Sequence, residues 1–236
     1  MSAALYDHSM GAAEFTRRRP GSGNQTGTIQ MQKETLFENI PEGSFEYFFS
    51  KTDGMITLEQ GLLLYDLAKS SENGCIVEVG AYRGRSTVAL GRGSLDGYRV
   101  PVYTIEPHEK FKGLYGWEFG PSDRGAFFKA MLDSGCYHVV RLINMSSEYI
   151  APSWEKDISL LWIDGDHTYK GVRRDFDCWV PFLRESAIVA FDDSLDPGAG
   201  PYRLIEELVA EGSFRLVSQV GRITVLQNDM SDLHNT

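Results

Sequence analysis

The feature that most constrains the fold of this chain is a regular alternation of short apolar runs with segments of helical spacing. The runs of strand length are Cys75–Val79, Val102–Ile105, Val139–Ile143, Ser159–Ile163 and Ala187–Phe191. The helical patterns between and around them lie at 57–68, 86–90, 126–132, 172–183 and 204–209. Strands that alternate with helices predict a parallel sheet with right-handed crossovers.

The end of the chain changes this pattern. Two strand-like runs, Phe214–Val217 and Ile223–Leu226, flank Gly221 and predict a closing antiparallel pair. The expected architecture is therefore an α/β fold, with a doubly wound, mostly parallel seven-stranded sheet that ends in a C-terminal antiparallel strand pair.

Four segments are expected along the chain. Residues 1–30 are rich in Gly, Ser, Thr and Gln and predict a flexible tail, either native or derived from an expression vector. Residues 31–56 form an N-terminal extension, whose amphipathic stretch could serve a homodimer interface. The α/β domain spans 57–228 and starts at the capping-box pattern Thr57–Gln60, and residues 229–236 are a C-terminal tail.

Composition excludes several classes of partner. A formal net charge of −10 argues against nucleic acid, because binding a phosphate backbone requires clustered Lys and Arg. The chain has no apolar run of about 18 residues, so no membrane span is expected. The three cysteines lack metal-site spacing and fit a reducing compartment, so the protein is expected to be soluble and cytoplasmic.

The turn after the first strand has the features of a ligand site. In the run Glu78–Ser86, Gly80 and Gly84 allow a sharp turn and close approach of the backbone to a ligand. The helix that follows offers free amide groups to an anion, and Ser86 adds a hydroxyl. The spacing differs from the GxGxxG of dinucleotide-binding folds, and an ordinary βα turn is the alternative.

A single carboxylate ends the second strand. Glu106 follows Ile105, where it could accept hydrogen bonds from both hydroxyls of a ribose. Alone, Glu106 is equally well explained as a solvated surface acid. Together with the glycine turn, it indicates a cofactor that contains a nucleoside.

Acidic residues gather after the fourth and fifth strands. Asp164, Asp166 and His167 follow one strand, and Asp192 and Asp193 follow the other. Unpaired like charges at this density are costly, so a divalent cation held by Asp164, Asp192 and Asp193, with Mg²⁺ the expected ion, is the simplest compensation. The alternative is that these aspartates cap helices. His167 is the candidate general base, although a lone histidine is often structural.

These motifs, in this order, resemble one known group of enzymes. They are the run Val77–Ser86, the pair Ile105–Glu106, the run Ile163–Tyr169 and the run Phe191–Asp193. Over about residues 57–227 the chain resembles the class I S-adenosylmethionine-dependent methyltransferases of methyltransferase family 24. It is also similar to metal-dependent small-molecule O-methyltransferases that act on catechols, caffeoyl-coenzyme A and macrolide sugars.

The resemblance implies a Rossmann-like class I methyltransferase fold and a set of cofactor contacts. Gly80 and Gly84 would shape the methionine pocket, Glu78 and Ser86 would contact the amino acid end, and Glu106 would bind the ribose. The full implied cofactor-binding set is Glu78, Gly80, Tyr82, Gly84, Ser86, Glu106, Ser146 and Asp164, with Ser146 beside the adenine. The resemblance also implies metal ligation by Asp164, Asp192 and Asp193.

Two departures separate the chain from the catechol-type enzymes. Those enzymes usually carry asparagine where Asp193 stands, and they use a lysine base that is not matched here. The Asp192–Asp193 pair and a histidine three residues after Asp164 look more like the sugar O-methyltransferases. A long aromatic loop, 111–120, indicates either a substrate lid or an ordinary packed loop.

The resulting hypothesis is a divalent-metal-assisted O-methyltransferase of secondary metabolism. Its acceptor would be a hydroxyl of a small molecule, either a natural product, a phenol or a sugar. Two alternatives stay open: a non-catalytic S-adenosylmethionine-binding interaction subunit, and a nicotinamide-dependent oxidoreductase, which the missing GxGxxG disfavours.

Overall fold

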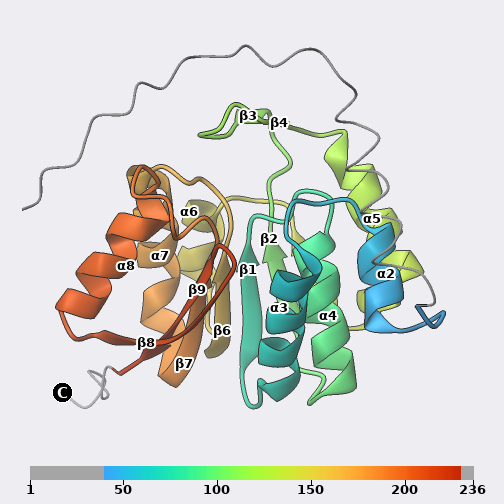
Figure 1. Cartoon of the computed structure of the whole chain (residues 1–236), viewed down its shortest axis with the longest axis horizontal. Helices are drawn as coiled ribbons and strands as arrows, with labels where there is room; N and C mark the ends of the chain where they lie inside the picture. The colour runs from blue at the N-terminus through green and yellow to red at the C-terminus, as the bar shows by residue number, and fades with distance from the viewer. Residues whose placement is uncertain (1–39, 230–236) are drawn as a thin grey trace, which may run out of the picture. The chain divides into compact units, whose positions relative to one another are not determined.

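The computed structural model describes residues 40–229, and the predicted tail at 1–30 lies outside this range. A seven-stranded sheet runs through the centre in the order β5-β2-β1-β6-β7-β9-β8 (Figure 1). Its strands are β1 (Cys75–Val79), β2 (Val102–Ile105), β5 (Val140–Ile143), β6 (Ile158–Ile163), β7 (Leu183–Phe191), β8 (Phe214–Val220) and β9 (Ile223–Asn228). A separate two-stranded hairpin consists of β3 (Phe111–Lys112) and β4 (Glu118–Phe119).

The pairing confirms the predicted fold class. Strands β5, β2, β1, β6 and β7 are parallel, whereas β9 pairs antiparallel with both β7 and β8. The register sets Val79 of β1 opposite Ile105 of β2 and Ile163 of β6. Ile163 in turn lies opposite Phe191 of β7. The residues that follow these four strands therefore leave the sheet side by side at one edge.

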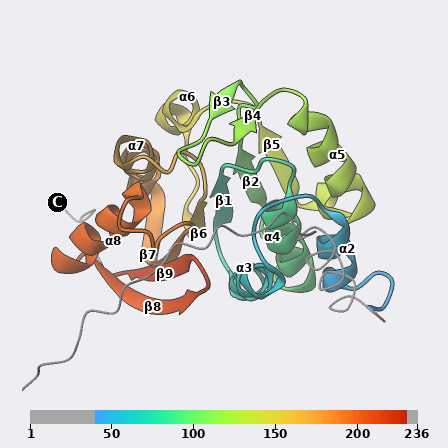
Figure 2. The same cartoon turned by 45° about the horizontal axis from the view of Figure 1, so that its top comes forward.

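Helices cover both faces of the sheet (Figure 2). One group comprises α2 (Phe45–Lys51), α3 (Leu58–Ser70), α4 (Arg85–Asp96) and α5 (Asp123–Asp133). The other comprises α6 (Ser147–Ile150), α7 (Tyr169–Trp179) and α8 (Gly200–Ala210), and single 3-10 turns lie at η1 (Cys136–His138), η2 (Ala151–Ser153) and η3 (Val180–Phe182). Within β1, Ile76 packs into the first core and Val77 and Val79 into the second, because alternate side chains of a strand point to opposite faces.

Local sequence explains where the helices begin and end. The predicted capping box is present: Gln60 N donates to Thr57 Oγ1 at 3.3 Å, and Thr57 N donates to Gln60 Oε1 at 2.9 Å. The helical pattern predicted at 172–183 begins earlier, at Tyr169, and ends at Trp179, because Pro181 cannot continue an α-helix. Within residues 40–229, no helix is long and apolar enough to cross a membrane.

A buried carboxylate joins β1 to its neighbours. Glu78 is fully buried, and its Oε1 accepts from Ser86 Oγ at 2.6 Å. Its Oε2 accepts from Thr87 Oγ1 at 2.7 Å and from Thr104 Oγ1 at 2.9 Å. Burial raises the pKa of Glu78, and although the three hydroxyls lower it, the result is about 7. The strand, the start of α4 and β2 are thus tied together through one side chain.

We expect Glu78→Ala to lower the free energy of unfolding by about 3 kcal/mol, because three buried hydroxyls lose their acceptor. Urea denaturation at pH 7 measures this change, with exposed Glu72→Ala as a control that shifts stability by less than about 0.5 kcal/mol. The folded pKa of Glu78 lies above its ordinary value of 4.5, so its contribution to stability decreases as pH rises from 4.5 to about 7. That pH dependence should be missing in the variant. A variant as stable as wild type would contradict the structural role.

Candidate active site

Two adjoining cavities open at the carboxyl ends of the parallel strands. The β2 cavity has a volume of about 290 Å³ and is lined by Ile105, Glu106, Ser146 and Asp166, among others. The acidic cavity, of about 120 Å³, is lined by Trp117, His167, Asp192, Asp193 and Arg222, among others. The two share the walls Gly80, Ala81, Tyr82, Phe111, Phe119, Asp164 and Gly165. The two cavities therefore adjoin along these residues.

The predicted glycine turn forms the shared wall. Gly80 has a φ of +85°, and a Cβ at this position would lie 2.2 Å from the Asp164 carbonyl oxygen, so only glycine lets the two strand ends approach this closely. The turn aims the amides of Ala81 and Tyr82 at Glu106 Oε2, at 3.0 and 3.2 Å. His108 N donates to the other oxygen of Glu106 at 2.8 Å. Glu106 is thus held at the wall of the β2 cavity by backbone donors.

The other residues implied as cofactor contacts have different positions. Ser146 lines the β2 cavity at the N-cap of α6, and Tyr82 lines both cavities. Ser86 lines the acidic cavity while its hydroxyl donates to the buried Glu78. Gly84, with a φ of +93°, is the N-cap of α4. Glu78 therefore supports the turn from beneath, and its direct contact with a cofactor stays a prediction.

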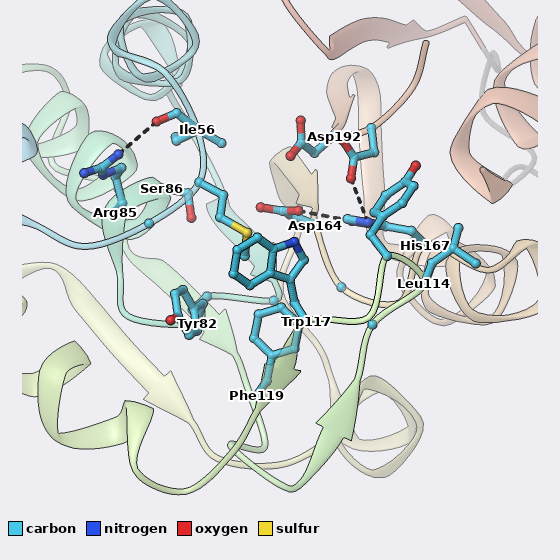
Figure 3. Close-up of a pocket in the computed structure, with 18 of the residues that line it drawn as sticks. Ile56, Tyr82, Arg85, Ser86, Leu114, Trp117, Phe119, Asp164, His167 and Asp192 are labelled. Carbon is cyan, nitrogen blue, oxygen red and sulfur yellow. Dashed lines mark hydrogen bonds and ion pairs between the residues drawn. The ribbon is translucent and has the colours of Figure 1, made fainter. Parts of the chain in front are cut away.

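The four predicted polar residues of the acidic cavity form one connected network with Arg222. His167 Nε2 lies 3.2 Å from Asp164 Oδ1, and His167 Nδ1 lies 2.9 Å from Asp193 Oδ2. Arg222 donates from Nη2 to Asp192 Oδ2 at 3.0 Å and from Nη1 to Asp193 Oδ1 at 3.1 Å. Figure 3 shows a dashed line that joins Asp164 to His167, with Asp192 close by on the neighbouring strand. Two cationic side chains thus lie among three carboxylates.

The charges in this network shift the pKa values of its members. Burial raises the pKa of Asp164, and burial together with the Asp164 charge raises the pKa of Asp192 to about 8. Burial also acts to raise the pKa of Asp193, but His167 and Arg222 outweigh it and hold the value below its usual range. Burial acts to lower the pKa of His167, but Asp164 and Asp193 raise it by more, so that it reaches about 10. In this arrangement the imidazole is protonated near pH 7 and donates from both nitrogens.

The donor set fits a divalent cation at two of the three predicted ligands. The Asp192 side chain is 3% exposed, and its Oδ1 has no hydrogen-bond partner among the described residues. Asp192 is a buried carboxylate whose pKa is raised by burial and by the charge of the partly buried Asp164, which is the situation a hard cation relieves. Asp193 has both oxygens engaged by His167 and Arg222. In residues 40–229 no group of three or more His, Cys, Asp or Glu side chains is arranged to hold a metal ion.

Two parts of the site escaped the sequence analysis. Arg222 lies in the turn between β8 and β9, and it reaches the site because antiparallel pairing brings the start of β9 to the end of β7, with Thr224 opposite Phe191. The antiparallel pairing of β9 with β7 was the signal that could have placed Arg222 near the site. The second part is the loop around Met55 and Ile56, which lines the acidic cavity. Arg85 donates to the carbonyl oxygens of Thr52 and Ile56, at 2.6 and 3.2 Å, and so fixes this loop.

The aromatic loop 111–120 folds as the β3–β4 hairpin above the strand ends (Figure 1). Trp117, although 64% exposed, and Leu114 line the acidic cavity. The ring of Tyr115 lies 6.4 Å from that of His167, and its hydroxyl donates to Asp196 at 3.0 Å. The hairpin is therefore part of the cavity wall.

The sheet order, the glycine turn and the acid after β2 define an α/β protein of the class that binds nucleoside-containing cofactors at the strand ends. The family model described as "Methyltransferase domain" matches residues 77–194, and the chain belongs to this family. The match runs from β1 through the pair Asp192–Asp193 and so includes most of the site.

Known proteins resemble this chain in fold. The O-methyltransferase TomG from Streptomyces achromogenes, involved in tomaymycin synthesis and crystallised with SAM, has a TM-score of 0.58 and 20% identity, over 85% of this chain and 96% of TomG. An O-methyltransferase from Bacillus cereus in complex with SAH has a TM-score of 0.61 and 16% identity, over 85% and 97% of the two chains. The uncharacterized protein y4gI of Sinorhizobium fredii is 28% identical in an alignment of 145 residues. That alignment covers 57% of this chain and 15% of y4gI. This chain thus matches a small part of that relative's length.

We expect Gly80→Ala to disrupt the site, because a Cβ there collides with the Asp164 backbone at a positive φ. The variant should lose at least about 2 kcal/mol of stability and bind cofactor more weakly. Gly125→Ala is the matched control: it lies in α5 with nothing within 4 Å of the added carbon, and should be neutral or more stable by up to about 1 kcal/mol. Thermal melting of both variants measures the difference. Equal melting temperatures would argue against the tight β1–β6 approach.

Proposed function

We propose that this protein is an S-adenosylmethionine-dependent O-methyltransferase that acts on a hydroxyl group of a small molecule. The observation that carries the proposal is the shared wall of the two cavities at Gly80–Tyr82 and Asp164–Gly165. A methyl donor in the β2 cavity would face an acceptor among acidic and basic side chains in the acidic cavity. Membership of the methyltransferase-domain family supports this function, as does the fold shared with O-methyltransferases.

The cofactor would lie along the strand ends. Glu106, held by three backbone amides, supplies carboxylate oxygens for the ribose hydroxyls, and Ser146 lies across the same cavity on the adenine side. The amino acid end would extend past Gly80 toward Ser86 in the acidic cavity. The sulfonium methyl would then lie near Asp164, which both cavities share.

The wall of the acidic cavity favours an acceptor with a flat, apolar body. Met55, Ile56, Leu114, Trp117 and Phe119 line the same cavity as the carboxylates. Three hydrogen-bonding side chains of this cavity are engaged within the protein: Arg85 with backbone carbonyls, Ser86 with Glu78 and Tyr115 with Asp196. A polar sugar would leave hydroxyls unpaired there, whereas an aromatic ring would pack on Trp117. Among natural products, phenols and sugars, we therefore favour a phenolic or other aromatic acceptor.

A divalent cation, with Mg²⁺ the expected ion, would be held by Asp164 and Asp192, with Asp193 as the third predicted ligand. When bound, such a cation lowers the pKa of an acceptor hydroxyl and offsets the carboxylate charge around it. Asp192 Oδ1, which has no hydrogen-bond partner within residues 40–229, and the partly buried Asp164 support this assignment. His167 would take the hydroxyl proton in its neutral form, which becomes available once the charges of Asp164 and Asp193, which keep it protonated, are offset, and the two cavities would hold donor and acceptor in line.

Cofactor binding provides the first test. Isothermal calorimetry should detect S-adenosylhomocysteine at micromolar affinity and no binding of NAD. Glu106→Gln should weaken the affinity by about 10- to 100-fold, because it removes the charged acceptor for the ribose. Glu155→Ala, an exposed acid away from both cavities, should bind as wild type does. Binding of NAD without S-adenosylhomocysteine would instead indicate a nicotinamide-dependent protein.

Turnover with labelled S-adenosylmethionine and a panel of phenols and sugars provides the second test. We expect transfer to a phenol, abolished by a chelator and restored by Mg²⁺. His167→Gln should lose at least about 100-fold in kcat and keep its affinity for S-adenosylhomocysteine. Full activity after chelation would contradict the proposed role of the metal. The close approach of donor and acceptor would then be the main source of the rate acceleration. Cofactor binding without transfer to any acceptor would favour a non-catalytic binding subunit.

A further inference from the structure

Arg222 makes the only arginine bridge between Asp192 and Asp193 in the described part of the chain. One guanidinium nitrogen lies 3.0 Å from Asp192 Oδ2 and the other 3.1 Å from Asp193 Oδ1. Both carboxylates belong to the predicted set of cation ligands. A guanidinium and a divalent cation on the same oxygens repel each other strongly, so the two cannot occupy them together.

The local structure lets the Arg222 side chain leave while its backbone stays. The Arg222 carbonyl oxygen accepts from Ser194 N at 3.0 Å and from Ser194 Oγ at 2.7 Å, which fastens the turn to the end of β7. The side chain itself is 45% exposed at the cavity edge, whereas the Asp192 side chain is 3% exposed. Rotation of the arginine into solvent therefore requires no change in the strand pair, and it uncovers oxygens that are otherwise buried.

The bridge leaves part of the negative charge uncompensated. Arg222 engages Oδ2 of Asp192, whereas the buried Oδ1 has no partner in residues 40–229. Asp164, on the neighbouring strand, is paired with His167 and not with Arg222. The arginine thus compensates only part of the charge of a buried carboxylate, so a divalent cation of higher charge can replace it.

We propose that Arg222 is an internal competitor for the cation site: it occupies Asp192 and Asp193 when no divalent cation is bound, and cation binding displaces it toward solvent. The inference rests on the proposed metal-assisted function. Arg222 is then a residue that sets how tightly the site binds a cation. A divalent cation then binds only at concentrations high enough to displace the guanidinium.

The experiment is a titration of the full-length protein with Mn²⁺ alone, followed by electron paramagnetic resonance of the free ion at constant pH. Arg222→Gln should bind Mn²⁺ at least about tenfold more tightly than wild type, because a competing charge is removed. Arg222→Lys keeps the charge but cannot bridge both carboxylates, and should fall between the two. Arg215→Gln, which removes an exposed arginine paired with Asp229 in the same strand pair, should bind as wild type does.

Asp192→Asn checks that the ion occupies this site, and it should weaken Mn²⁺ binding by at least about tenfold. Unchanged or weaker binding in Arg222→Gln overturns the inference, as does unchanged binding in Asp192→Asn or a lack of binding in every variant. If Arg222→Gln does not fold, as judged by thermal melting, Arg222→Lys decides alone: tighter binding than wild type supports the inference, and equal or weaker binding overturns it. Calorimetry with S-adenosylhomocysteine on the same samples separates this result from the proposed function, since cofactor binding does not require the competition to exist.

Discussion

The site depends on the parallel backbone ladder that holds four strand ends level. Val79, Ile105, Ile163 and Phe191 are matched across β2, β1, β6 and β7. The ladder continues one residue beyond the strands: Asp164 N donates to the Val79 carbonyl oxygen at 2.8 Å, and Asp192 N donates to that of Ile163 at 3.1 Å. Because backbone bonds fix these positions, the polar residues that follow each strand are brought together before any side-chain interaction forms. A shift of one residue in any pair would turn these side chains to the other face.

The fully buried Glu78 gives this ladder its rigidity at β1. Three hydroxyl groups from α4 and β2 satisfy its carboxylate, so the turn between β1 and α4 is tied to the second strand from below. Above it, Glu106 accepts hydrogen bonds from the backbone amides of the same turn. The glycine turn is therefore held from both sides, which prepares the β2 cavity for a ligand without further ordering of the chain.

Electrostatics make the acidic cavity different from the β2 cavity. Three carboxylates lie close together with two cationic side chains, and the pairing is uneven. Asp193 has two cationic partners, whereas one oxygen of Asp192 has no partner in the part of the chain that the structure describes. An uncompensated carboxylate charge in a buried site costs free energy unless a ligand compensates it. Side chains of the aromatic hairpin line the same cavity, so that the charged groups share a small volume with apolar side chains. This combination underlies both the proposed acceptor class and the proposed role of Arg222.

The sequence by itself determined the fold class and the candidates at the strand ends. Apolar runs of strand length, the glycines of the first turn and the acids after each run are local signals, because they depend on the neighbours of each residue along the chain. Cys75–Val79 and Val102–Ile105 were predicted with the bounds that the structure gives them, and the capping box at Thr57 was found from four letters. Helix ends were less accurate, since the start of α5 at Asp123 and the stop of α7 at Trp179 depend on packing and on Pro181.

Only the tertiary structure decided which of these candidates meet, and in what electrostatic state. Arg222 is about 30 residues from Asp192 in the sequence and reaches it only because β9 runs antiparallel to β7. The loop at Met55 and Ile56 joins the cavity through the side chain of Arg85, a contact that no local pattern encodes. The sequence also predicted a neutral histidine base, whereas the folded chain places His167 between two carboxylates that raise its pKa. Charge interactions of this kind depend on distances between residues far apart in the chain, and folding alone sets those distances.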